Sequence, residues 1–222
     1  MGNVSVTGMV VSQMQMGEYD RRIELLTKEL GRISAFARGA RKPSSDLIAS
    51  SCVFAFGQFE LFQGKNSYTL KSARISNYFT ELAGDIELSY YGFYFLEICR
   101  YFSRENVEAG DMLALAYFSL RALLTESLDR RLVRSVFEIR MLNLNGLCPA
   151  AEDIISPESR YSPGFAIDES TAHAIRHVLL SPLNKLYTFK LSEEVLSCFT
   201  DVAGYLMNRF VDRKFKSLEF IR

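Results

Sequence analysis

The side chains best suited to chemistry in this sequence are basic and lie close together between residues 28 and 42. Five cations stand there against the single carboxylate of Glu29: Lys28, Arg32, Arg38, Arg41 and Lys42. The segment RGARKPSS, at residues 38–45, holds no acidic residue. Lysine and arginine neutralise phosphates and release their counterions, so such a cluster suits a polyanion. Nucleic acid is therefore the first ligand that the sequence predicts.

Six basic side chains are candidates for phosphate contact. The first choice is the group within the basic segment itself: Arg38, Arg41 and Lys42. The second choice is a group on predicted strands, where a charge can also simply solubilise one face: Arg32, Lys71 and Arg74. A further basic cluster lies near the C-terminal end: Arg209, Arg213, Lys214 and Lys216. That cluster can complement the dipole of a last helix or extend a nucleic-acid path, and the sequence leaves both interpretations open.

Charge is divided unevenly along the 222 residues, which carry 26 Lys and Arg and 26 Asp and Glu in total. Residues 1–80 hold ten basic and six acidic residues, a net of +4, so residues 81–222 hold sixteen and twenty, a net of −4. An asymmetry of this kind indicates two domains with different partners, with chance as the alternative explanation.

Patterns for metal binding or nucleophilic catalysis are scarce. His173 and His177 stand at helical spacing for a zinc pair, but Ala174 occupies the position where the HExxH motif has its general base. No third ligand sits at a standard spacing, and no nucleophile elbow or phosphate-binding loop is present. The cysteines are dozens of residues apart, without a CxxC pair: Cys52, Cys99, Cys148 and Cys198. We expect free thiols, no metal, no cofactor and no catalytic activity.

Period-two patterns place strands in the first third of the chain. Val4, Val6, Gly8 and Val10 alternate with polar or small residues. Two apolar runs, residues 23–26 and 33–37, flank a turn that ends at Gly31 and predict a hairpin. Residues 53–62 predict a longer strand with a bend at Gly57, and residues 67–74 predict a last strand. Five strands over residues 1–80 favour an OB-fold β-barrel that binds nucleic acid, with an SH3-like barrel as the alternative.

The apolar period changes to that of a helix from about residue 82. One expected stripe contains Ile86, Tyr90, Phe93, Tyr94 and Ile98, and similar stripes recur at residues 113–124, 132–144 and 195–210. Residues 81–222 therefore predict an all-α bundle, which makes the whole chain α+β. The aromatic residues of 90–102 are expected to fill the core, although they could also form a stacking surface for bases. Proline interrupts the pattern at about residues 148–170, where we expect an irregular loop.

The N-terminal residues and the composition predict a cytoplasmic protein. The start lacks a basic segment followed by an unbroken apolar run, so no secretory signal is recognised. With 48% hydrophobic and 23% charged residues, the composition is that of an ordinary globular chain. The most apolar stretch, residues 88–99, is too short to span a bilayer and contains Glu97.

Several sequence blocks, in order along the chain, resemble the RecO family of bacterial recombination mediators. Residues 6–13 read VTGMVVSQ, and residues 17–45 read GEYDRRIELLTKELGRISAFARGARKPSS, similar to the family pattern of G-E-x-D, L-L-T and a basic G-A-R segment. The block FGQFELFQGKNSYTLKSARISNYF follows. In the helical half, FEIRMLNLNGLCP and the terminal FKSLEFI are also similar to family segments. The resemblance covers nearly the whole chain.

The resemblance implies a non-catalytic DNA-repair protein of the bacterial cytoplasm and nucleoid. RecO-like proteins bind single- and double-stranded DNA and anneal complementary strands. They engage the acidic C-terminal tail of single-strand-binding protein, and with RecR they help to load RecA. A tail-binding site needs an apolar pocket edged by cations on the helical domain, where four arginines are near in sequence: Arg121, Arg130, Arg131 and Arg134.

One departure from the family and one rival interpretation remain. Many members carry a four-cysteine zinc element after the G-x-x-P segment, whereas here Cys148 is the only cysteine of that region, which makes a bound zinc doubtful. The rival is a non-catalytic protein-interaction scaffold with only weak, nonspecific affinity for DNA. Charge reversal of Arg38, Arg41 and Lys42 distinguishes the two, because it should abolish DNA binding by a mediator and leave partner binding intact.

Overall fold

A computed structural model describes residues 2–65 and 67–221 of the chain. Contacts divide these residues into two compact units, 1–113 with 220–222 and 114–219. The first unit holds the described strands together with α-helices, and the second holds helices, so the α+β fold class is confirmed. The sequence places a domain boundary near residue 80, where the apolar pattern changes from a strand period to a helix period. That boundary stays a prediction.

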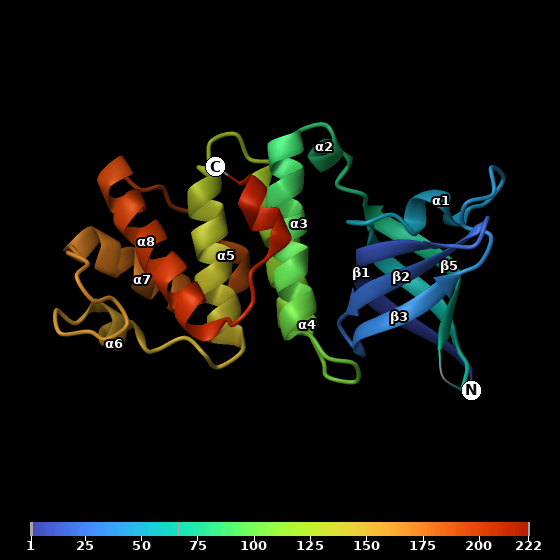
Figure 1. Ribbon diagram of the computed structural model, residues 1–222, viewed down its shortest axis with the longest axis horizontal. Coiled ribbons are helices and arrows are strands. Elements are labelled where there is room, and N and C mark those ends of the chain that lie inside the picture. Colours follow the sequence, from blue (N-terminus) through green and yellow to red (C-terminus); the bar gives the residue numbers. More distant parts are fainter. Residues whose placement is uncertain (1, 66, 222) are drawn as a thin grey trace. The chain divides into compact units, whose positions relative to one another are not determined.

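The described part of the first unit contains five strands in one sheet: β1 (Gly2–Met16), β2 (Asp20–Thr27), β3 (Gly31–Ala37), β4 (Phe56–Gln63) and β5 (Tyr68–Asn77). Their order is β1-β2-β3-β5-β4, and β1 also pairs with β4, which closes the sheet into a barrel (Figure 1). All pairings are antiparallel except that of β3 with β5, which joins through Ala35 with Tyr68 and Phe36 with Thr69. The short helix α1 (Leu47–Ser50) lies between β3 and β4 in sequence. The predicted OB-fold is confirmed.

Alternation along the strands builds the barrel core. Side chains at every second position of a strand point to the same face, so one set from each strand fills the interior. The interior set is almost fully buried: Val6, Val10, Ile23, Leu25, Ile33, Ala35, Phe59, Leu61 and Leu70. The intervening side chains, such as Arg22, Lys71 and Arg74, are exposed on the outer face. The strand pattern thus decides which side chains can meet a ligand.

The expected strand over residues 53–62 begins later than predicted. Phe54 has a φ of 74°, in the left-handed region that an extended strand cannot include, and β4 starts only at Phe56. A register irregularity separates Phe56 from Gly57, at the position of the predicted bend. A Cβ at Gly57 would lie 2.2 Å from the carbonyl oxygen of Arg74, so β4 and β5 approach each other too closely there for a side chain.

The first unit continues with two helices and the start of a third: α2 (Thr80–Ala83), α3 (Ile86–Phe102) and α4 (Gly110–Leu123). The buried face of α3 differs from the predicted stripe, since Ile86 is 77% and Phe93 40% exposed. Tyr94 and Ile98 are buried as predicted, and Tyr91 and Phe95, which lie outside the predicted stripe, are buried as well. Most aromatic residues of this helix therefore pack in the core, as expected. The sequence does not identify the buried face fully, because α3 is apolar at nearly every position and its helical period is weak.

Backbone hydrogen bonds attach the β2–β3 turn to the loop after α3. Arg32 N donates to Arg104 O at 3.1 Å, and Asn106 N donates to Leu30 O at 2.9 Å. Gly31, at the centre of this attachment, has a φ of 64°. A Cβ there would lie 2.0 Å from the oxygen of Arg104, so the position requires glycine both for its conformation and for space.

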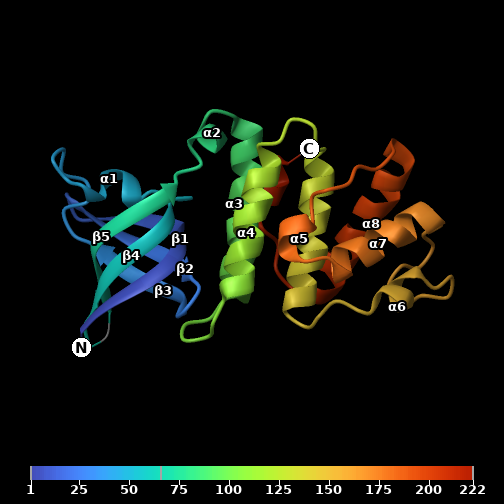
Figure 2. The same cartoon turned by 180° about the vertical axis from the view of Figure 1, so that it is seen from behind.

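The second unit is built from the remainder of α4 and four further α-helices among the described residues: α5 (Arg130–Leu144), α6 (Ala151–Ile155), α7 (Glu169–Leu180) and α8 (Glu193–Phe210). Two short 3-10 helices complete the chain: η1 (Leu183–Lys185) and η2 (Lys216–Phe220). Helices α5, α7 and α8 pack on one another, with Phe137, Ile175 and Phe199 buried (Figure 2). No described helix is both long and apolar enough to cross a bilayer.

We predict that Gly31→Ala destabilises the protein by roughly 2–4 kcal/mol, because the added methyl group meets backbone oxygen in addition to the strain of a left-handed conformation. Gly17→Ala is the matched control, since Gly17 also has a positive φ but has no atom within 4 Å of its added Cβ. Urea unfolding monitored by circular dichroism measures both variants. Equal losses of stability in the two variants would contradict the close approach at Gly31.

Candidate nucleic-acid interface

The basic segment after β3 is fastened to the turn between β1 and β2. Arg41 N donates to Tyr19 O at 2.8 Å, and Gly39 N donates to the Asp20 carboxylate at 2.7 Å. In Figure 1 the blue β1–β2 turn and the segment leading to α1 lie together at one end of the barrel. In OB-folds this β1–β2 loop is part of the usual oligonucleotide-binding region.

The first-choice cations share this fastened segment but play different parts. The Arg41 guanidinium donates to Glu18 O at 3.0 Å and more distantly to Gly17 O, so it holds the turn. The Lys42 ammonium lies 5.6 Å from the centre of the Tyr19 ring and is exposed. Arg38 is exposed and has no hydrogen-bond or ion-pair partner among residues 2–65 and 67–221. Arg38 and Lys42 are thus the cations most available to phosphate.

Tyr19 gives this end of the barrel an exposed ring. Its exposed fraction is 43%, and the neighbouring Glu18 side chain raises the pKa of its hydroxyl through a hydrogen bond. The ring therefore stays neutral at physiological pH. A neutral ring next to an ammonium group attracts the cation through its π electrons and leaves part of its surface to contact a base.

The second-choice cations are placed apart from one another. Arg32 forms an ion pair with Glu24 at 2.9 Å, and Glu24 also pairs with Arg100 at 2.6 Å, so much of the Arg32 charge is already compensated. Lys71 lies 5.6 Å from the centre of the Phe62 ring. Arg74 is exposed further along β5. Lys71 and Arg74 can contribute to a basic outer face, whereas the geometry of Arg32 favours a structural part.

Sequence reasoning did not identify the outward-facing aromatic residues. Phe36 pairs across strands with Arg22 and with Thr69, and Thr69 pairs in turn with Phe62. These residues alternate with buried Ala35 and Leu61, so they face outward, and Phe62 is 38% exposed. The signal was present as apolar residues at the polar positions of a period-two pattern. Two rings in one row beside Arg22 and Lys71 form a surface on which bases could stack.

The side chains considered for metal or nucleophilic chemistry do not converge. His177 contacts the Ser181 hydroxyl at 3.2 Å and the Lys185 carbonyl at 3.3 Å, while His173 is exposed. Within the part of the chain that the structure describes, no group of three or more His, Cys, Asp or Glu could hold a metal. Burial raises the pKa of Cys99 and raises that of Cys148 to about 12, so both thiols stay protonated and weakly nucleophilic.

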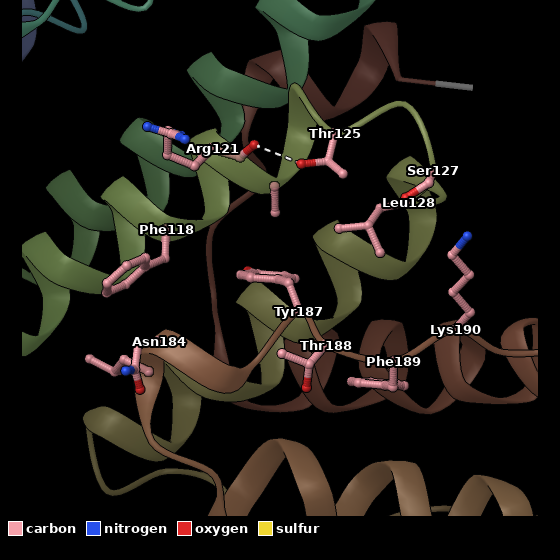
Figure 3. Close-up of a pocket in the computed structure, with 12 residues that line it drawn as sticks. Phe118, Arg121, Thr125, Ser127, Leu128, Asn184, Tyr187, Thr188, Phe189 and Lys190 are labelled. Atoms are coloured by element: carbon pink, nitrogen blue, oxygen red, sulfur yellow. Dashed lines mark hydrogen bonds between the residues drawn. The ribbon is translucent and has the colours of Figure 1, made fainter.

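A pocket of about 580 Å³ opens in the second unit between α4 and the segment after η1. Its apolar lining includes Phe118, Leu128 and Phe189 (Figure 3). The hydroxyl of Tyr187 forms a hydrogen bond with that of Ser119. Burial raises the pKa of Tyr187.

Two cations, Arg121 and Lys190, lie on opposite sides of the apolar residues in Figure 3. Of the four arginines singled out in the sequence, Arg121 lines this pocket, whereas Arg131 and Arg134 form ion pairs with carboxylates. Arg130 is not among the lining residues. The sequence does not indicate Lys190 as a lining residue, because it reaches the pocket only through the path that the chain takes after η1.

Comparison with known proteins gives matches along nearly the whole chain. The family models for the N-terminal and C-terminal parts of recombination protein O match residues 1–79 and 83–219. The DNA repair protein RecO of Acetivibrio thermocellus is 30% identical over 100% of this chain and 97% of its own length. The proteins of the same name from Clostridium perfringens strain 13 and from an Exiguobacterium are 25% and 29% identical, over 97% and 89% of this chain and 96% and 81% of their own lengths.

We predict that the double variant Arg38→Glu/Lys42→Glu binds a labelled single-stranded oligonucleotide roughly ten to a hundred times more weakly than the wild type. Losing two phosphate contacts should also flatten the slope of log affinity against log salt by about 1.4. The measurement is fluorescence anisotropy over a salt series.

The control Lys28→Glu/Lys185→Glu changes the net charge by the same amount at two exposed lysines outside the fastened segment. Although Lys28 is close in sequence to the basic segment, it lies in the β2–β3 turn and is not one of the six candidates for phosphate contact. An identical loss in both variants would mean that overall charge, and not this end of the barrel, governs binding.

Proposed function

Because this chain belongs to the RecO family, we propose that it is a DNA-repair and recombination protein that works by holding nucleic acid and partner proteins, without a catalytic step of its own. The observation that carries this proposal is the fastened basic segment at the end of an OB-fold, in a chain matched by RecO models over residues 1–79 and 83–219. Its relatives are named DNA repair proteins.

The barrel is the proposed DNA-binding part. Arg38 and Lys42 project from a segment held by backbone hydrogen bonds, so the cations are positioned before DNA arrives. The exposed rings of Tyr19 and Phe62 offer surfaces to unpaired bases. Phosphate contact and stacking both act without regard to base sequence, which suits a protein that must bind any damaged region. We propose binding of both single- and double-stranded DNA at this surface.

Strand annealing follows from the same chemistry. Two complementary strands repel each other through their phosphates, and a cationic surface screens this repulsion. Base pairing then supplies the driving force, provided that the base edges stay free. Contacts through backbone phosphates and ring faces leave those edges free. Annealing therefore needs neither a catalytic acid nor a metal, in keeping with our proposal that no cofactor takes part.

The pocket of the second unit is the proposed site for the acidic C-terminal tail of single-strand-binding protein. Phe118 and Phe189 offer apolar contact, and Arg121 and Lys190 offer charge on both sides. An acidic peptide with an apolar end matches that combination. Held in this way, the chain would be recruited to single-stranded DNA that is already coated, where we propose that it acts with RecR to help load RecA in the bacterial cytoplasm.

Annealing of two labelled complementary oligonucleotides, each pre-coated with single-strand-binding protein, tests the mediator proposal directly. We expect the wild type to accelerate annealing, and we expect Arg38→Glu/Lys42→Glu to lose at least tenfold of that acceleration while Lys28→Glu/Lys185→Glu keeps it. If the wild type binds single-strand-binding protein but does not accelerate annealing, the result would favour the protein-interaction scaffold.

A labelled peptide with the sequence of the acidic tail tests the pocket. We predict that Arg121→Glu/Lys190→Glu weakens peptide binding by at least tenfold, because attraction becomes repulsion on both sides of the apolar residues. Lys185→Glu is the control, since Lys185 is an exposed cation at the end of η1 that does not line the pocket. Fluorescence anisotropy gives both affinities. Unchanged binding by the double variant would move the tail to another surface.

A further inference from the structure

A second cluster of cations and rings lies in the helical unit, around Tyr161. The Arg160 guanidinium carbon is 4.8 Å from the centre of the Tyr161 ring, and that of Arg209 is 5.4 Å from the same centre. Both distances are within the range of a cation–π contact. Arg160 belongs to the irregular segment between α6 and α7, whereas Arg209 belongs to the last turn of α8. Two cations distant in sequence therefore share one ring.

These two arginines differ from other arginines of the unit in what surrounds their charge. Arg131 pairs with Asp129 and Glu193, and the pKa of each carboxyl is lowered mainly by its hydrogen bond with Arg131. Arg176 likewise pairs with Glu152 and Glu169.

Arg160 and Arg209, by contrast, have no carboxylate partner in the part of the chain that the structure describes. Two positive charges without a carboxylate partner therefore lie within reach of one ring, and an anion bound there would be attracted to both.

The cluster is organised in the absence of a ligand. Tyr205 on α8 donates its hydroxyl to the carbonyl oxygen of Arg160 at 3.3 Å and accepts from Arg209 at 3.5 Å. Phe210 stacks against Tyr161, with ring centres 6.2 Å apart. Ser162 donates to Ile154 O at 2.5 Å and holds the segment to α6. A ligand would therefore meet side chains that are already in place, which lowers the entropic cost of binding.

We propose that Arg160, Arg209 and the rings of Tyr161 and Tyr205 form a second contact site for single-stranded nucleic acid, separate from the barrel. Both guanidinium groups are exposed and both rings are half-buried. A single strand presents phosphates and flat bases in alternation, and arginine binds the first and stacks on the second. An acidic peptide would engage only the charges, whereas a single strand can also stack a base on a guanidinium plane, so nucleic acid fits the cluster better. This inference rests on the proposed function only in its choice of nucleic acid as the ligand.

Photocrosslinking tests the site without relying on overall affinity. A single-stranded oligonucleotide containing 5-iodouracil is irradiated with the full-length protein, and crosslinked peptides are identified by mass spectrometry. We expect crosslinks at Tyr161 or Tyr205 in the wild type and also in Arg38→Glu/Lys42→Glu, whose barrel site is impaired. Crosslinks confined to the barrel would overturn this inference and leave the proposed function standing, whereas absence of any DNA binding would overturn both.

Anisotropy with the double variant Arg160→Gln/Arg209→Gln supplies the second measurement. Loss of two phosphate contacts should reduce the log–log salt slope by about 1.4 and weaken binding of the single strand roughly three- to tenfold. Lys28→Gln/Lys185→Gln removes the same charge elsewhere and should leave most of the slope. Equal slopes in the two variants would contradict the site. Intact oligonucleotide binding together with lost binding of an Asp- and Glu-rich peptide would overturn it in favour of an acidic protein segment.

Discussion

Repulsion between like charges is the constraint that organises both cation-rich surfaces of this protein. Cations that together attract phosphate must lie close to one another although they repel. Carboxylate partners would relieve that repulsion but would also neutralise the positive charge. The barrel meets this requirement with backbone carbonyls around Arg41 and a ring beside Lys42. The helical unit meets it with the ring of Tyr161. Carbonyl dipoles and π electrons hold a cation in place without removing its net charge.

The same constraint separates uncompensated charges from structural ones. Arg32, Arg131 and Arg176 each face at least one carboxylate, and they tie strands or helices to their neighbours. Arg38 lacks such a partner among the described residues. The sequence already ranks Arg32 below Arg38, because a charge on a strand can simply solubilise one face, but only the fold reveals the carboxylate of Glu24 that pairs with Arg32.

Much of the fold could be predicted from the sequence, because period-two alternation and the turn at Gly31 are local signals. The start of β4 could not be predicted, since the left-handed backbone of Phe54 has no signature in a residue type that usually avoids it. The buried face of α3 was obscured by apolar residues on all sides of the helix. The pocket that contains Lys190 and the ring row of Phe36 and Phe62 depend on contacts between segments distant in sequence, which no single window of residues reveals.

The attachment between the β2–β3 turn and the loop after α3 uses main-chain atoms on both sides. Side chains at Glu105, Val107 and Glu108 are exposed and take no part in those hydrogen bonds. Mutations could therefore accumulate at these three positions over evolutionary time without loosening the attachment, while any side chain at Gly31 opposite them would meet backbone oxygen. The loop after α3 can thus vary in sequence while Gly31 on the other side of the contact stays fixed. Sequence variability alone would wrongly indicate that this loop is dispensable.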